Sequence, residues 1–111
     1  MALEAVPAHV RAWIEISESG ATLVIRIGGE LDASNRAEIE PTVLAAIASA
    51  QSVIIDLAEL TFCDSRGIAM FIAAQEKASA EETAISFRHV VGPVRRVFDI
   101  TRLDTIVDLR D

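Results

Sequence analysis

The sequence contains no tyrosine, one tryptophan and one cysteine among its 111 residues. A single cysteine excludes an internal disulfide, which is typical of proteins from a reducing compartment. Aromatic residues make up 5% of the chain and hydrophobic residues 51%. We therefore expect one globular domain with an aliphatic core, to which Phe62, Phe71, Phe87 and Phe98 are added.

Positive charge is also scarce, because 10 basic residues stand against 17 acidic ones and give a formal net charge of −7. This balance disfavours binding to nucleic acid or to an anionic membrane, and it favours a protein partner. No apolar stretch approaches the roughly 20 residues that a membrane span needs. The first thirty residues lack a basic leader followed by an apolar block. We expect a soluble, cytoplasmic protein.

Patterns that carry catalysis or bind metals are missing as well. His9, Cys63 and His89 stand apart in the sequence, so no metal site is expected. There is no glycine-rich phosphate loop and no Gly-x-Ser-x-Gly elbow, and no cofactor is expected. The residue types of a catalytic triad are present in Ser65 and His89 with Asp64 or Asp32, but nothing in the sequence places His89 as the base. We expect that the protein is not an enzyme, and we interpret Cys63 as a small buried hydrophobic residue.

Hydrophobic periodicity predicts the order β-β-α-β-α-β-α with a brief strand or tail at the end. Strands are expected over 10–17, 22–27, 53–57 and 83–87, and helices after residue 34, over 65–80 and from Pro93. Residues 1–9 form a loose lead-in. Strands separated by helices imply right-handed crossovers and a partly parallel sheet. The predicted fold is a single α/β domain whose mixed four- to five-stranded sheet carries helices mainly on one face.

The start of the first helix leaves alternatives open. Gly28 and Gly29 are expected to end the second strand in a turn or bulge. Asp32 or Ser34 would serve as the N-cap. Pro41 either kinks the helix or marks where its main part begins.

The buried faces of the two later helices are predicted from helical spacing. In the second helix Ile68, Phe71, Ile72 and Gln75 share one side. Met70 and Ala74 lie outside this set, so we expect them either to face a partner or to be scattered apolar residues on the surface. In the third helix the predicted buried stripe consists of Val94, Val97, Phe98 and Ile100.

The segment 53–68 is a buried strand followed by the motif Asp64, Ser65, Arg66 and Gly67 and then by a helical pattern. The motif places the Ser65 hydroxyl at a helix N-terminus, where backbone N–H groups and the helix dipole favour negative charge. Serine and aspartate are also ordinary N-caps, so Ser65 is either a cap or a functional hydroxyl. A phosphate there adds about −1.5 to −2 charges, which the helix end tolerates and a partner surface does not.

Taken together, segments 29–32, 53–57 and 62–68 resemble the STAS domain of bacterial anti-sigma-factor antagonists. Residues 94–104 resemble that family's C-terminal helix and the turn after it. The resemblance extends from about Arg11 to Asp108, which puts a STAS domain at residues 10–111.

The resemblance implies a function. In that family the unphosphorylated antagonist binds an anti-sigma factor that is also a serine kinase, and binding frees the sigma factor. The kinase phosphorylates the motif serine and releases the antagonist, and a PP2C-type phosphatase restores it. Carried over, Ser65 is the phosphoacceptor and Asp64 its motif neighbour. Asp32 contributes to kinase contact, and Gly67 lets a partner backbone approach closely.

The chain departs from the family at three positions. Arg66 stands where many relatives carry serine or threonine, which removes a second phosphosite. Arg66 is then a partner-binding residue, a partner for phosphoserine, or simply solvated. Arg102 replaces a common glycine, and Ser34 a common threonine. The alternative function is a constitutive STAS adaptor, such as a subunit of a lipid-transport ABC complex, which needs no phosphorylation.

Overall fold

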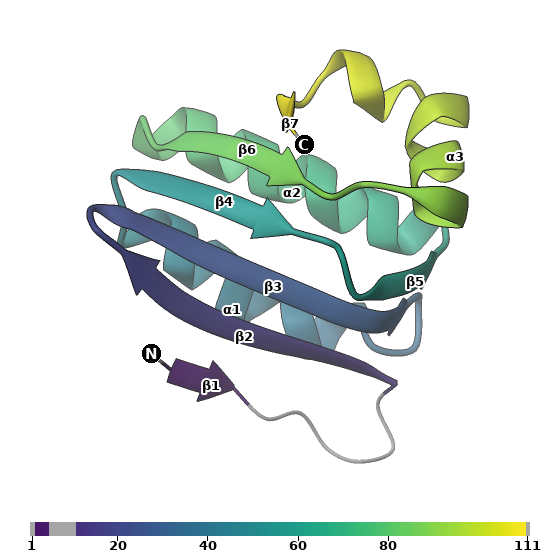
Figure 1. Ribbon diagram of the computed structural model, residues 1–111, viewed down its shortest axis with the longest axis horizontal. Coiled ribbons are helices and arrows are strands. Elements are labelled where there is room, and N and C mark those ends of the chain that lie inside the picture. The colour runs from purple at the N-terminus through teal and green to yellow at the C-terminus, as the bar shows by residue number, and fades with distance from the viewer. Residues whose placement is uncertain (1, 5–10, 111) are drawn as a thin grey trace.

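The computed structural model describes residues 2–4 and 11–110 and contains a seven-stranded sheet in the order β1-β2-β3-β4-β6-β7, with β5 paired to β3 (Figure 1). The strands are β1 (Ala2–Glu4), β2 (Ala12–Ser19), β3 (Thr22–Leu31), β4 (Ser52–Asp56), β5 (Leu60–Cys63), β6 (Ala84–Arg88) and β7 (Leu109–Arg110). The helices are α1 (Arg36–Ala48), α2 (Ser65–Glu81) and α3 (Gly92–Ile100), followed by the short 3-10 helix η1 (Leu103–Thr105).

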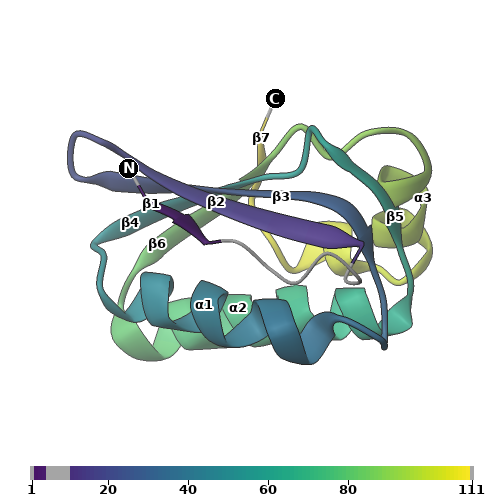
Figure 2. The same cartoon turned by 90° about the horizontal axis from the view of Figure 1, so that it is seen from below.

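The sheet is mixed, as predicted. β1, β2 and β3 pair antiparallel, whereas β4, β5, β6 and β7 join by parallel pairing. α1 and α2 lie side by side under one face of the sheet, and α3 lies at its end beside β5 (Figure 2). The predicted α/β class with helices mainly on one face is therefore confirmed.

Two short strands were not predicted. β1 lies within the expected lead-in of residues 1–9, whereas residues 5–9 lie outside the described part of the chain, as does Val10 of the predicted strand 10–17. β5 lies between the predicted strand 53–57 and the predicted helix 65–80, where a connection without a strand was expected. It runs along β3 after β4 has ended, and its burial does not alternate. The sheet therefore has more strands than the four or five expected.

The core is aliphatic with three phenylalanine rings at its centre. Phe71, Phe87 and Phe98 are each 0% exposed, and their ring centroids lie 5.5–6.0 Å apart. Phe62, also assigned to the core, is instead 46% exposed on β5.

β3 does not end at Gly28 and Gly29, because the strand continues to Leu31. Of the predicted turn or bulge, the structure has a bulge, between Gly29 and Glu30. A Cβ on Gly28 would lie 2.2 Å from the Trp13 ring, and Gly29 has φ +87°. The two glycines thus let the strand pass close to β2 instead of stopping it.

α1 begins at Arg36 with Asn35 in the N-cap position, so the prediction of Asp32 or Ser34 as N-cap was wrong. The reason is that the Asn35 side chain accepts from the Asp32 N–H at 3.0 Å and donates to the Glu30 carbonyl at 2.6 Å. The Asn35 and Arg36 N–H groups also donate to the Asp32 carbonyl, so residues 33–35 form a turn and the helix begins only after it. Pro41 lies inside the continuous helix and does not start it.

Two predicted helix faces need correction. Met70 and Ala74 are 0% exposed, because α2 packs against both the sheet and α1 and therefore buries more than one stripe. Ile100 is 73% exposed at the last position of α3, whereas Val94 and Phe98 are buried as expected.

Candidate functional site

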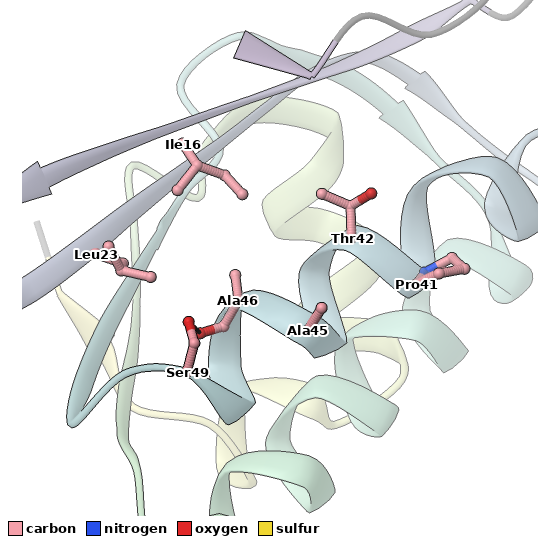
Figure 3. A pocket seen from close by; sticks show the side chains of 7 residues that line it. All are labelled: Ile16, Leu23, Pro41, Thr42, Ala45, Ala46 and Ser49. Atoms are coloured by element: carbon pink, nitrogen blue, oxygen red, sulfur yellow. Dashed lines mark hydrogen bonds between the residues drawn. The ribbon is translucent and has the colours of Figure 1, made fainter. Parts of the chain in front are cut away.

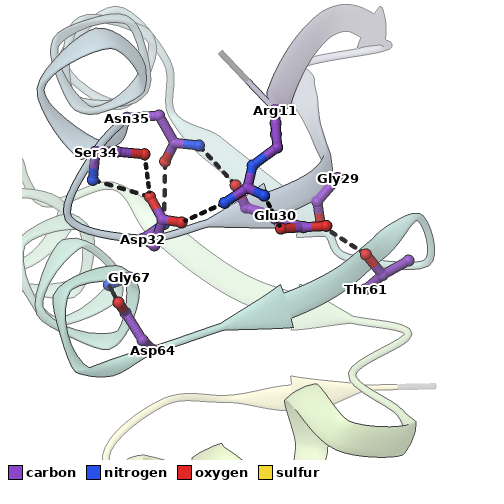
Figure 4. Close-up of polar contacts among 9 residues, drawn as sticks. All are labelled: Arg11, Gly29, Glu30, Asp32, Ser34, Asn35, Thr61, Asp64 and Gly67. Carbon is purple, nitrogen blue, oxygen red and sulfur yellow. Dashed lines mark hydrogen bonds and ion pairs between the residues drawn. The ribbon is translucent and has the colours of Figure 1, made fainter. Parts of the chain in front are cut away.

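The candidate site lies where β3 and β5 end next to each other. Leu31 pairs with Cys63, and the Asp64 N–H donates to the Leu31 carbonyl at 3.3 Å. The residue that follows each strand is an aspartate, Asp32 after β3 and Asp64 after β5. The pairing therefore brings segments 29–32 and 62–68 together at the start of α2 (Figure 4).

Asp64, and not Ser65, is the N-cap of α2. Its Oδ1 accepts from the Arg66 N–H at 2.9 Å and from the Gly67 N–H at 3.2 Å. Ser65 is the first helical residue and is exposed. Among the residues that the structure describes, none forms a hydrogen bond with the Ser65 hydroxyl. The question left open by the sequence is thus resolved against a capping role for Ser65.

We expect alanine at these two adjacent positions to affect stability differently. Asp64→Ala should lower the free energy of unfolding by about 1 kcal/mol, because it removes the cap. Ser65→Ala should change it by less than about 0.5 kcal/mol, as for an exposed residue without a structural bond. Urea denaturation of the two variants measures both values. An equal loss in Ser65→Ala would contradict the assignment of the cap.

Asp32 is held ionised and fixed in position. Hydrogen bonds from the hydroxyl and then the backbone N–H of Ser34 lower the pKa of the Asp32 carboxyl, and the Arg11 guanidinium adds to this. The Ser34 N–H lies 2.8 Å from Oδ1, and Arg11 Nη2 lies 3.4 Å from Oδ2. Asp32 therefore places a defined negative charge at this edge of the sheet, as Figure 4 shows.

Sequence reasoning missed Arg11 and Asn35, which organise this corner. Arg11 pairs with both Glu30, at 3.3 Å, and Asp32. The Asn35 amide bridges Glu30 and Asp32. An asparagine just before a helical pattern is a sequence signal for such a turn, because its side chain bonds local backbone groups. The Arg11 contact has no local signal, since it spans 21 residues.

Gly67 is required by the packing of the chain itself, apart from any contact with a partner. It is buried, and a Cβ there would lie 2.5 Å from Cys63 Sγ and 3.0 Å from the Leu31 carbonyl oxygen. The missing side chain admits the chain's own β3 and β5. The parts of Asp32, Asp64, Arg66 and Gly67 in partner binding stay predictions.

Cys63 is 3% exposed, and burial, followed by the nearby Asp64 charge, raises its pKa to about 12. This confirms its interpretation as a buried apolar residue. His89 is not placed as the base of a catalytic triad with Ser65, because its Nδ1 lies 3.0 Å from Asp56 Oδ1. His9 lies outside the described residues. Within residues 2–4 and 11–110, no three potential ligands cluster to hold a metal ion.

Among the described residues, no helix has the length and apolar character needed to cross a bilayer.

A protein family described as Mlab, STAS domain, matches residues 14–109. The chain belongs to the STAS domain family, which confirms the resemblance inferred from its motifs.

Solved structures with the same fold include anti-sigma-factor antagonists. One, from Mycobacterium paratuberculosis, is 26% identical with a TM-score of 0.80, over 88% of this chain and 84% of that one. The unphosphorylated form of SpoIIAA is 23% identical with a TM-score of 0.72, over 88% of each chain. The phosphorylated form of SpoIIAA, a Bacillus cell fate determinant, is 22% identical with a TM-score of 0.66, over 88% of this chain and 91% of that one.

Proposed function

We propose that this protein is an anti-sigma-factor antagonist switched by phosphorylation at Ser65. In the cytoplasm its unphosphorylated form binds an anti-sigma factor that is also a serine kinase, and so frees a sigma factor. The kinase phosphorylates Ser65 and thereby ends binding, and a PP2C-type phosphatase restores it. The protein is thus the substrate of an enzyme and not itself one.

The observation that carries this proposal is that the Ser65 hydroxyl forms no hydrogen bond with any described residue. Serine at a helix start usually satisfies a backbone N–H group. Here Asp64 already does so, and Ser65 is exposed. An accessible hydroxyl without a structural bond is available to a kinase, and its modification breaks no contact among the described residues.

The position also supports a switch that leaves the fold intact. The first turn of a helix carries partial positive charge and tolerates an added phosphate. A protein surface pressed against that turn does not, because burying an unpaired charge is costly. Phosphorylation therefore acts on the interface and not on the domain.

The comparisons support the proposal in two ways. The Mycobacterium paratuberculosis protein of the same fold is an anti-sigma-factor antagonist. The STAS fold is also found in both the unphosphorylated and the phosphorylated forms of SpoIIAA. This fold therefore accommodates phosphorylation in at least one protein.

Incubation with ATP and each serine-kinase anti-sigma factor of the same genome tests the proposal. We expect mass spectrometry to find one phosphate, at Ser65, and none in the Ser65→Ala variant. The adjacent position is Arg66, so no second phosphate should follow. If no such kinase modifies Ser65, the switch is excluded and a constitutive adaptor becomes the better description.

A further inference from the structure

A surface hollow of about 410 Å³ lies between α1 and Arg66, the residue that follows Ser65 in the first turn of α2. Its lining consists of Ala33, Arg36, Ala37, Glu40, Pro41 and Arg66. Small apolar groups form its walls, and charged groups stand among them. Its shape and lining therefore suit an apolar side chain that has a charged neighbour.

The charges of the hollow do not cancel. Arg36 Nε lies 2.7 Å from Glu40 Oε1, so these two side chains compensate each other. Arg66 is exposed and forms no ion pair with any described residue. The hollow thus presents one uncompensated positive charge on a protein whose formal net charge is −7. A carboxylate is the complementary group.

The hollow is linked to the proposed switch site by Arg66, which lines it. Arg66 follows Ser65 in the first turn of α2, so a partner that covers Ser65 also covers Arg66. Towards the other end of α1, Pro41 also lines a second hollow of about 460 Å³ whose lining includes no charged residue (Figure 3). Of these two hollows, only the one lined by Arg66 therefore carries an uncompensated positive charge that favours a carboxylate.

We propose that the kinase anti-sigma factor docks an apolar side chain into the hollow lined by Ala37 and places an adjacent carboxylate against Arg66. This inference rests on the proposed function and specifies its recognition chemistry. It also supplies a mechanism of release. A phosphate on Ser65 lies next to Arg66, competes for the guanidinium and repels the partner's carboxylate.

Two substitutions in the hollow and two matched controls test this docking. Arg66→Glu reverses the free charge, and Ala37→Glu adds a charge to an exposed wall position. Arg96→Glu is the control on α3, where Arg96 is likewise exposed and without an ion pair among the described residues. Ala80→Glu is the control at an exposed position near the end of α2.

Calorimetric titration of the unphosphorylated protein with the kinase gives the affinities. We expect Arg66→Glu and Ala37→Glu to bind at least about tenfold more weakly, Arg66→Lys to keep most of the affinity, and both controls to stay within about twofold. If the hollow variants bind like their controls while Ser65→Asp still loses binding, this inference is overturned and the proposed function stands. If the unchanged protein binds no such kinase, both are overturned.

Discussion

Ser65→Asp is expected to weaken binding of the kinase anti-sigma factor about a hundredfold, which corresponds to about 2.7 kcal/mol. The carboxylate brings a negative charge into the proposed interface, to which we also assign Asp32 and Asp64, and an unpaired buried charge costs several kcal/mol. The free energy of unfolding should fall by less than about 0.5 kcal/mol or rise slightly, because negative charge at a helix N-terminus is favourable. Calorimetric titration and urea denaturation measure the two effects.

Ser79→Asp is the matched control for this variant, since Ser79 is exposed in the last turn of the same helix. There the negative charge meets the opposite end of the helix dipole, so stability should fall slightly. Binding should not change, because this position is at the far end of α2. Unfolding of Ser65→Asp, or full affinity for the kinase, would contradict the charge-tolerance argument.

Phe71→Ala is expected to lower the free energy of unfolding by about 3–5 kcal/mol. The Phe71 ring is 0% exposed and lies 5.6 Å from Phe87 and 5.5 Å from Phe98 between ring centroids. Its removal leaves a cavity that neighbouring rings fill only in part. Urea denaturation measures the loss.

Phe62→Ala provides the comparison at an exposed position of the same residue type. Phe62 is 46% exposed, so its removal should cost less than about 1.5 kcal/mol of stability. Similar losses in the two variants would mean that the three-ring cluster does not hold the core.

The elements with clear periodicity were predictable from the sequence. β2, β6 and α2 follow apolar patterns of period 2 or 3.6, which arise from burial on one face, and β4 is a short continuous apolar run typical of a buried strand. The position of Ser65 at a helix start was also predictable. Which of Asp64 and Ser65 caps the helix was not, because it depends on the extended backbone of Asp64, with φ −102° and ψ −169°.

The rest of the site depends on contacts between distant segments. β5 is recognisable only through its pairing with the end of β3, which in turn requires the bulge after Gly29. The packing reason for Gly67 follows from the same pairing, since Leu31 and Cys63 surround it. Such contacts leave no periodic signal, so the packing reason for Gly67 could not be predicted from the sequence.

The most direct test compares the affinity of the kinase anti-sigma factor for the unmodified protein and for the same protein carrying phosphoserine at position 65. Circular dichroism and urea denaturation of both forms establish that each is folded. We expect tight binding of the unmodified form, binding weaker by at least about a hundredfold for the phosphorylated form, and similar stability of the two. Equal affinity of the two folded forms would contradict the claim that Ser65 is the switch.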